Sequence, residues 1–246
     1  MIDIIRDNWL IFLIGQYPNG PLGGLSLTLI LSVLGLGLSF PISVAIALCR
    51  TGSIRWLANA ATVFVYIVRG IPLVMLVFWA YFLVPVLVGH NVSGVTTLLC
   101  TLVLYEAAYL SEVIRAGLIS LPKGQTEASR ALGIGYWRTI FYVLLPQALF
   151  NMVPSIVSQL VSTIKETSIG YVISVQELTF EANSVNNNLL TRPFAVFMIL
   201  ALTYFVACFA LTQFAHYLER RVARKRTRNN QVSPRSLEND PILESQ

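Results

Sequence analysis

Charged side chains are scarce in this sequence. Asp, Glu, Lys and Arg make up 12% of its 246 residues, whereas they usually account for about 25% of a soluble domain. Seven of the 17 basic residues lie in residues 219–246, so the net charge of +5 comes mostly from the tail. This composition excludes a disordered chain and a nucleic-acid-binding domain with a basic face. It also argues against an ordinary water-soluble enzyme.

Metal-binding and catalytic motifs are missing as well. The cysteines Cys49, Cys100 and Cys208 lie in apolar runs without CxxC spacing, which is typical of small buried side chains. The two histidines, His90 and His216, lack metal-site spacing, and no H-E-x-x-H, G-x-S-x-G or G-x4-G-K-[ST] pattern is present. We therefore predict no catalytic residue, no metal site and no cofactor in this chain.

What the sequence has instead is long hydrophobic runs, and 55% of its residues are hydrophobic. A helix that crosses a bilayer needs roughly 20 mostly apolar residues. The candidate spans are 25–48, 71–88, 95–114, 149–173 and 194–214. The third contains Glu106 and Glu112, and the fourth contains Lys165 and Glu166. The sequence therefore predicts an all-α membrane protein with five transmembrane helices in one domain, residues 25–218, without internal repeats.

A shorter apolar stretch, residues 56–68, lies between the first two spans. It is too short to cross a bilayer, so it predicts an interfacial or buried helix. The following Gly-Ile-Pro resembles a helix start, because proline is tolerated at the first helical position. We expect Arg69 at the level of the lipid headgroups. The alternative, one helix over residues 58–84, would place Arg69 in hydrocarbon at a cost of at least ~2.5 kcal/mol.

Basic residues gather in alternate connections between the spans. One side carries Arg50, Arg55, Arg69, Arg115, Lys123, Arg130, Arg138 and most basic residues of the tail, and the other carries Arg6 and Arg192. Cytoplasmic loops are enriched in Lys and Arg. Five spans therefore predict a periplasmic N-terminus and a cytoplasmic C-terminus.

The two ends of the chain follow from this topology. Residues 1–24 are expected to form a periplasmic segment, and their short apolar stretch does not resemble a secretory signal peptide, so we expect them in the mature protein. Residues 219–246 are polar and contain two prolines. They predict a disordered cytoplasmic tail, which serves either as a solvated topology anchor or as a contact with anionic lipid.

The longest cytoplasmic connection, residues 115–145, predicts a helix–turn–helix. Pro122 stands at the start of a short helical pattern and Gly133 just after its end, which is the expected asymmetry of helix termini. A second helical stretch follows from Tyr136 to Leu144. Small residues lie on one side of the first helix and apolar residues at the tip, as suits the groove of a partner protein.

The residues of this connection resemble a known signature. Glu127-Ala128-Ser129, three residues, Gly133, nine residues and then Val143-Leu144-Leu145-Pro146 resemble the EAA motif, EAA-x3-G-x9-I-x-LP, of integral-membrane subunits of bacterial ABC importers. Ser129 replaces an alanine and Val143 an isoleucine. Segments that resemble the polar amino-acid branch, and most of all its glutamate/aspartate permease subunits, begin at Arg69, Glu106, Ile114, Lys123, Leu145 and Lys165.

This resemblance implies a type I ABC importer transmembrane fold and a multi-pass protein of the bacterial inner membrane. It further implies a non-catalytic permease subunit that translocates a polar amino acid. The implied partners are an ABC ATPase dimer that binds ATP–Mg, a second permease subunit, identical or different, and a periplasmic amino-acid-binding protein, with membrane lipid around them and no nucleic acid. The coupling helix that docks on the ATPase would include Glu127, Ala128, Ser129, Leu132 and Gly133.

Four ionisable residues within the spans are candidates for the substrate path, because such groups usually face a bundle interior or a water-filled cavity. For Glu112 an ion pair with Arg115 at i, i+3 is the alternative. Lys165 and Glu166 would form contacts between subunits or bind the amino-acid cargo. Glu106 would bind an α-amino group or hydrogen-bond a neighbouring helix.

Two other classes of function remain as alternatives. An intramembrane enzyme needs a nucleophile–base pair or a metal, and Glu106 and Glu112, six residues apart on a helix, point about 120° away from each other. An ion-driven secondary transporter normally shows inverted repeats and more spans.

Overall fold

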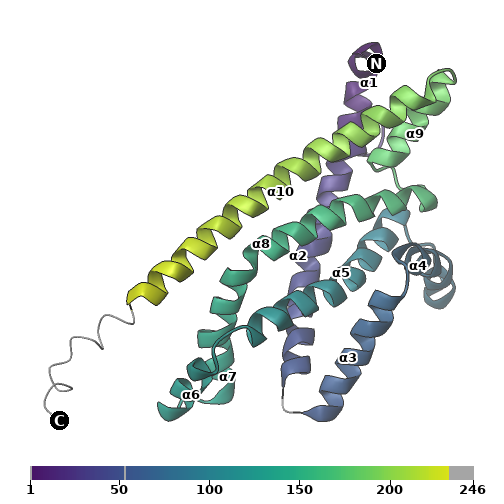
Figure 1. Cartoon of the computed structure of the whole chain (residues 1–246). Helices are drawn as coiled ribbons and strands as arrows, with labels where there is room; N and C mark the ends of the chain where they lie inside the picture. The colour runs from purple at the N-terminus through teal and green to yellow at the C-terminus, as the bar shows by residue number, and fades with distance from the viewer. Residues whose placement is uncertain (1, 53, 233–246) are drawn as a thin grey trace, which may run out of the picture.

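The structure is a computed structural model that describes residues 2–52 and 54–232, with side chains described for 3–52 and 54–221. Within these residues every regular element is a helix (Figure 1). The longer elements are α2 (Gly24–Thr51), α5 (Gly94–Ile119), α8 (Leu145–Glu166) and α10 (Pro193–Val232). The all-α prediction is therefore confirmed for the described part of the chain.

Four candidate spans satisfy the length and hydropathy expected of a transmembrane helix: Gly24–Thr51, Gly94–Ile119, Tyr136–Ile173 and Pro193–Arg221. A fifth arises if the bent pair α3 (Arg55–Gly70) and α4 (Leu73–Val88) counts as one span. The two helices of this pair meet at 99°. The described chain therefore has four or five candidate spans, against the five expected.

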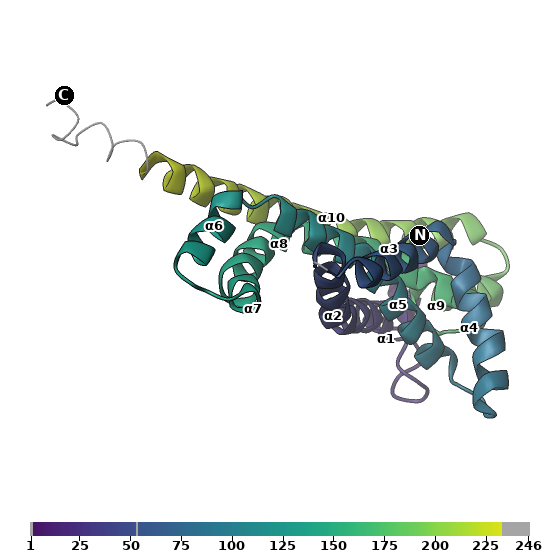
Figure 2. The same cartoon turned by 90° about the horizontal axis from the view of Figure 1, so that it is seen from below.

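The bend between α3 and α4 has a local cause. Pro72 disfavours a helical conformation in the residue before it, and Ile71 has extended backbone angles. Residues 56–68 form a helix, as expected, and it is buried on one side only: Val65 and Val68 are buried and α3 contacts α2 and α5, whereas Trp56, Val63, Tyr66 and Ile67 are exposed. After the bend, α4 runs in another direction than α3 and packs against α5, with Leu73 and Val77 buried (Figures 1 and 2).

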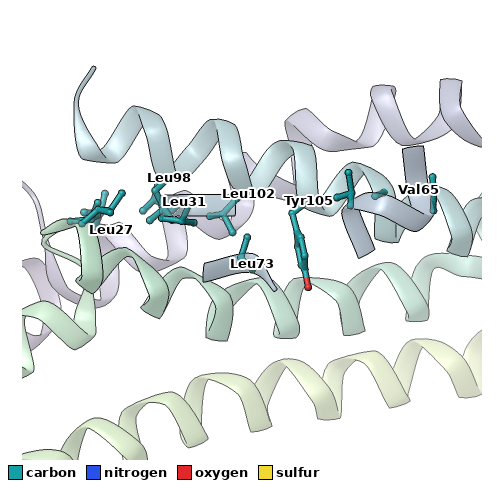
Figure 3. Close-up of a cluster of buried hydrophobic side chains, with 12 residues drawn as sticks. Leu27, Leu31, Val65, Leu73, Leu98, Leu102 and Tyr105 are labelled. Atoms are coloured by element: carbon teal, nitrogen blue, oxygen red, sulfur yellow. The ribbon is translucent and has the colours of Figure 1, made fainter. Parts of the chain in front are cut away.

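The main core joins the helices on either side of this bend. Leu27 and Leu31 of α2 meet Leu98 and Leu102 of α5, and Val65 of α3 and Leu73 of α4 belong to the same cluster (Figure 3). These leucine side chains are at most 8% exposed. Because lipid tails are as apolar as leucine, close van der Waals packing rather than exclusion of water holds such helices together, and α2 and α5 share the most extensive contact of any helix pair in the described structure. The α2–α5 pair is therefore the central packing unit of the fold.

Hydroxyl groups inside α2 donate to carbonyl groups of the same helix. Thr28 donates to the Gly24 carbonyl and Ser32 donates to the Thr28 carbonyl, at 3.2 and 2.7 Å. Such bonds satisfy polar groups where no water is available. Thr28 also accepts the backbone N–H of Leu178, at 3.2 Å, and so connects α2 to the start of α9 (Leu178–Leu189).

The two ends of the chain differ from expectation in one respect. The N-terminal segment contains helix α1 (Ile2–Ile14) and packs against α2 and α9. Residues 219–232, expected to be disordered, continue α10 as a helix, because five of these fourteen residues are Arg, which favours a helix that has already started. The expected disorder of residues 233–246 lies outside the described residues.

Helices from distant parts of the sequence meet at each end of the bundle (Figure 1). The short helices α6 (Lys123–Ala131) and α7 (Tyr136–Arg138) lie at the same end as the connection between α2 and α3. Helices α1 and α9 lie at the opposite end. The α2–α3 connection and α6, which are expected in the cytoplasm, thus lie at the opposite end of the bundle from α1 and α9, which belong to segments expected in the periplasm.

Candidate functional site

The candidate coupling element is α6 and the turn that follows it. Gly133 has φ +72°, the left-handed conformation that favours glycine. Its N–H donates to the Arg130 carbonyl, and the N–H of Ile134 donates to the Ser129 carbonyl, both at 2.9 Å. This pair of bonds is a Schellman motif. The expected end of the helix just before Gly133 is confirmed, and the structure shows that the turn there is left-handed.

The side chains of the EAA segment divide between an outer and an inner face. Glu127, Ala128 and Gly133 are exposed, and Leu132 is 78% exposed. Ser129 is buried, and its hydroxyl donates to the Gln125 carbonyl at 2.8 Å. The outer face is therefore available for docking, whereas Ser129 stabilises α6 from within.

The second half of the connection leads directly into α8. After α7, residues Thr139–Leu144 form a π-helix, a rare type that occurs mostly as single turns within α-helices and frequently at functional sites. Aromatic side chains follow one another along it, with Trp137 and Phe141 stacked at a centroid distance of 6.0 Å. The exposed apolar side chains near the tip are Leu132, Tyr136, Trp137, Phe141 and Tyr142. An exposed apolar patch of this kind marks an interaction surface.

Glu106, in the middle of α5, is fully buried and joins α5 to α8. Its carboxylate accepts hydrogen bonds from Gln159 Nε2 at 2.9 Å and from Thr163 Oγ1 at 2.7 Å. Both oxygens of Glu106 thus have a partner on α8. Of the two roles expected for Glu106, this geometry supports the bond to a neighbouring helix.

Glu112, also on α5, lies between two guanidinium groups. It forms ion pairs with Arg115, as expected for an i, i+3 pair, and with Arg50 of α2. The Arg50 side chain is 5% exposed, and its Nε also donates to Thr62 Oγ1 of α3 at 3.3 Å. The sequence spacing indicated Arg115 but gave no sign of Arg50, 62 positions away.

Lys165 and Glu166 end α8 and project in different directions. Lys165 is exposed and forms no ion pair within the described side chains. Glu166 is partly buried, and its Oε2 is buried without a hydrogen-bond partner in the described structure. The nearby groups that interact with the Glu166 carboxyl are Glu106 and Lys165. The structure therefore gathers three of the four predicted path residues, Glu106, Lys165 and Glu166, and places Glu112 in a separate ion-pair network.

The Arg69 side chain stacks on a tyrosine of α5. Its guanidinium carbon is 4.9 Å from the centre of the Tyr109 ring, and Tyr109 lies within the candidate span Gly94–Ile119. This contact arises because α3 packs against α5, which a sequence pattern does not reveal. The position of Arg69 at the level of the lipid headgroups stays a prediction.

A family comparison agrees with this arrangement of helices. Residues 37–224 match the family described as "binding-protein-dependent transport system inner membrane component". The match includes the EAA segment and all four candidate path residues.

Curated relatives carry permease names. The chain is 35% identical over 212 residues to the probable glutamine ABC transporter permease protein GlnP of Bacillus subtilis (strain 168), covering 84% of this chain and 97% of that protein. It is 32% identical over 209 residues to the inner membrane amino-acid ABC transporter permease protein YhdY of Escherichia coli (strain K12). That match covers 83% of this chain but only 57% of YhdY.

Solved structures show the same fold. A crystal structure of an amino acid ABC transporter with histidines matches with a TM-score of 0.73 and 30% identity, covering 80% of this chain and 92% of that chain. An inward-facing structure of the MetNI methionine ABC transporter matches with a TM-score of 0.60 and 22% identity, covering 78% and 91%, which indicates the fold alone. The chain therefore has the type I ABC importer permease fold, and it belongs to the family of binding-protein-dependent transport system inner membrane components, as a multi-pass membrane protein and permease subunit of an amino-acid ABC importer.

Proposed function

We propose that this chain translocates a polar amino acid across the bacterial inner membrane, driven by a separate ATPase that docks on α6. The observation that carries the proposal is the exposed outer face of α6, which ends in the Schellman turn at Gly133. ATP–Mg would be bound by two ATPase subunits and not by this chain. Closure of the ATPase dimer would pull the coupling helices together and turn the cavity from inward- to outward-facing.

The docking surface would consist of Glu127, Ala128, Leu132 and Gly133, with Ser129 supporting it from within. The small side chain of Ala128 and the absent side chain of Gly133 permit close approach of a partner. Leu132, 78% exposed, would fill an apolar pocket of the ATPase. In this orientation α6 is cytoplasmic and the N-terminus periplasmic, in agreement with the distribution of Lys and Arg.

The cargo belongs to the glutamate and glutamine group of amino acids. Several relatives are named for glutamine. One relative, 32% identical, is named a glutamate/glutamine/aspartate/asparagine transport system permease protein, although the chain covers only 49% of it. Lys165 and Glu166 would contact the cargo, with Glu106 holding α5 and α8 in place behind them. The favoured cargo within this group is glutamate or aspartate, because the exposed Lys165 has no ion-pair partner within the described side chains.

Two further partners complete the proposed importer. A second permease subunit, identical or different, would lie beside this chain, and a periplasmic amino-acid-binding protein would deliver the cargo. Copurification from the native membrane, followed by identification of the subunits, distinguishes a pair of identical permeases from a pair of different ones.

The decisive experiment reconstitutes the copurified complex in proteoliposomes and supplies the binding protein with labelled glutamate, aspartate, glutamine or asparagine. We expect uptake only when ATP–Mg reaches the ATPase and the binding protein is present. Uptake that persists without ATP but stops when an ion gradient is collapsed would instead indicate a secondary transporter. Conversion of the amino acid to another compound would indicate an intramembrane enzyme.

A further inference from the structure

A cavity of about 300 Å³ lies between the connection from α2 to α3 and helix α7. The residues that line it from both sides include Leu48, Cys49, Ile54, Leu57, Tyr136 and Trp137. None of the described residues in the lining is charged, and cavities of roughly 300–1,000 Å³ are large enough to hold a small ligand. Both sides of the cavity belong to the same end of the bundle (Figure 1). The fold thus leaves an apolar space beside the candidate coupling element.

This cavity lies at the ends of two candidate spans. Leu48 is in the last turn of the span Gly24–Thr51, and Tyr136 is the first residue of the span Tyr136–Ile173. The end of a span lies where the acyl chains meet the lipid headgroups, and tryptophan and tyrosine are enriched at that level. The cavity has one residue of each kind, and its Trp137 is 61% exposed. A lipid molecule can therefore reach the cavity from the bilayer.

Two exposed arginines border the cavity. Arg55 follows Ile54 in the chain, and Arg138 follows Trp137, so the Cα atom of each arginine lies about 3.8 Å from that of a lining residue. Neither arginine takes part in an ion pair of the described side chains. Long basic side chains near the ends of transmembrane helices extend their charged groups toward the headgroups. The rim of the cavity is therefore cationic, whereas its interior is apolar.

Acidic residues are missing from both parts of the chain that line the cavity. Residues 8–105 and 128–165 contain no Asp or Glu. Arg50, which follows the lining residue Cys49, is already paired with Glu112 of α5. A guanidinium group matches a phosphate group through two parallel hydrogen bonds. The charge at the rim thus favours a ligand with an anionic phosphate, and the apolar interior favours a hydrocarbon chain on the same ligand.

We propose that this cavity binds an anionic phospholipid from the leaflet at the α6 end of the bundle. One acyl chain lies against Ile54 and Trp137, and the phosphate lies at the rim beside Arg55 and Arg138. Because the lining residues of both sides share one cavity, a single lipid contacts both. Basic pockets between transmembrane helices bind anionic headgroups in this way. The bound lipid joins the connection that carries α6 to α2 and α3, and none of the four candidate path residues lines the site.

Cys49 reports whether the cavity is occupied, because it is a free thiol in the lining. The test alkylates the copurified permease–ATPase complex in neutral detergent with N-ethylmaleimide and follows each cysteine by peptide mass spectrometry. Palmitoyl-oleoyl-phosphatidylglycerol (POPG) or the matching phosphatidylcholine (POPC) is added in increasing amounts. We expect POPG to halve the rate at Cys49 at about one tenth of the POPC concentration or less. Cys100, exposed on α5 and outside the lining, should react at the same rate throughout.

The double variant Arg55→Gln/Arg138→Gln tests the headgroup end of the site and should make POPG and POPC about equally effective. The matched control is Arg6→Gln/Arg192→Gln, which removes two exposed arginines from α1 and from the connection between α9 and α10, at the other end of the bundle. It should keep the wild-type preference. Coelution with the ATPase on a sizing column checks that each complex assembles, and Arg55→Gln alone replaces a double variant that fails to assemble.

Dihexanoyl-phosphatidylglycerol tests the acyl-chain end of the site, because it has the headgroup of POPG but short chains. Fewer methylene groups in an apolar cavity mean weaker binding. We therefore expect this lipid to protect Cys49 only at concentrations at least about tenfold higher than POPG.

Four results would overturn the assignment. Equal effects of POPG and POPC on the wild type remove the preference for an anionic lipid. A preference that both double variants lower equally reflects general attraction by charge and not a site. Equal protection by the short-chain lipid and POPG places the acyl chain outside the cavity. Protection of Cys49 without lipid that disappears when the ATPase is dissociated identifies the ATPase as the occupant. None of these results affects the proposed import function, which the uptake assay tests separately.

Discussion

Arg50, one residue before the end of α2, forms an ion pair with Glu112 of α5 while its side chain is only 5% exposed. Glu112 is 28% exposed and also pairs with Arg115. One carboxylate thus pairs with two guanidinium groups and ties α2 to α5 at the end of the bundle where α6 lies. Among the described residues, the ion pair between Arg50 and Glu112 joins the positions farthest apart in the sequence. It therefore stabilises the end of the bundle that carries α6.

We expect Arg50→Met to destabilise the protein more than Arg115→Met. Removal of Arg50 breaks the more buried contact, and because Glu112 is partly solvated and keeps Arg115, we expect a loss of about 1–3 kcal/mol rather than the roughly 3–5 kcal/mol of a fully buried pair. Arg115→Met should cost roughly 0.5 kcal/mol, as exposed i, i+3 pairs do. Thermal unfolding in detergent measures both. A double-mutant cycle with Glu112→Gln gives the coupling energy, and a coupling near zero would contradict the structural role.

Gly133→Asp should abolish transport while the protein still inserts into the membrane. An aspartate adds a side chain and a charge at a left-handed position on the exposed docking face, and the left-handed conformation alone costs roughly 1–2 kcal/mol. ATP-dependent uptake and the amount of protein in the membrane fraction are the measurements. Gly124→Asp is the control for the added charge, because Gly124 occupies an exposed position of α6, the helix that ends just before Gly133. Uptake at the wild-type rate would exclude Gly133 from coupling.

Glu106→Gln should lower stability with little effect on cargo affinity. The buried carboxylate accepts from Gln159 and Thr163, and an amide turns one of its acceptors into a donor, so one of these bonds is lost at a cost of roughly 1–3 kcal/mol. The melting temperature and the KM for uptake are measured together. A KM that rises about tenfold without a change in melting temperature would instead make Glu106 a direct contact of the cargo.

Gly24→Ala should be strongly destabilising. Gly24 has φ +60°, and a Cβ there would lie 2.6 Å from the Phe12 carbonyl oxygen and 2.8 Å from that of Ile11. Backbone strain alone costs roughly 1–2 kcal/mol, and the clash with backbone atoms adds to it. Gly37→Ala, in the same helix with no atom within 4 Å of the position that its methyl group would take, should stabilise by about 0.5–1 kcal/mol. Equal melting temperatures for the two variants would refute the close approach of α1 to α2.

Glu177, before α9 and outside the candidate spans, should make stability depend on pH. Burial raises the pKa of Glu177 from 4.5 to about 7, against the opposing effect of hydrogen bonds from the Thr179 and Phe180 amides and the Tyr204 hydroxyl. The folded state therefore holds this proton more tightly than the unfolded state. Protonated Glu177 therefore contributes roughly 3 kcal/mol to the free energy of unfolding below pH 4.5. This contribution is lost as the pH rises to about 7.

Glu177→Gln should flatten this pH dependence, because a neutral amide stays neutral throughout. Burial also raises the pKa of Glu181, whose two oxygens have no hydrogen-bond partner in the described structure, so part of the slope should remain. Glu127→Gln, at an exposed position, is the control and should keep the wild-type slope. The measurement is the melting temperature between about pH 4.5 and 8. If the melting temperature of Glu177→Gln changes with pH as steeply as that of the wild type, Glu177 is not the cause of the pH dependence.

Local features of the fold followed from the sequence. The apolar runs predicted helices at α2, α5, α8 and α10, because a run of apolar residues reports how much surface a helix must hide from water. The Pro–Gly pattern placed α6 and its left-handed turn at Gly133, since both depend on backbone angles of a few neighbouring residues. Helix α9 was not predicted, because its asparagine-rich sequence resembles a loop and its N-cap is the unusual Glu177.

The sequence by itself determined that this chain is a helical membrane protein with an EAA-type connection, because length, hydropathy and short motifs are properties of neighbouring residues. Only the tertiary structure decided which charges meet. It joined Glu112 to Arg50, enclosed Glu106 between two side chains of α8 and brought Arg69 over Tyr109. The physical reason is that electrostatic and hydrogen-bond contacts act over a few ångströms in space, whereas the partners lie 40 to 62 positions apart in the chain.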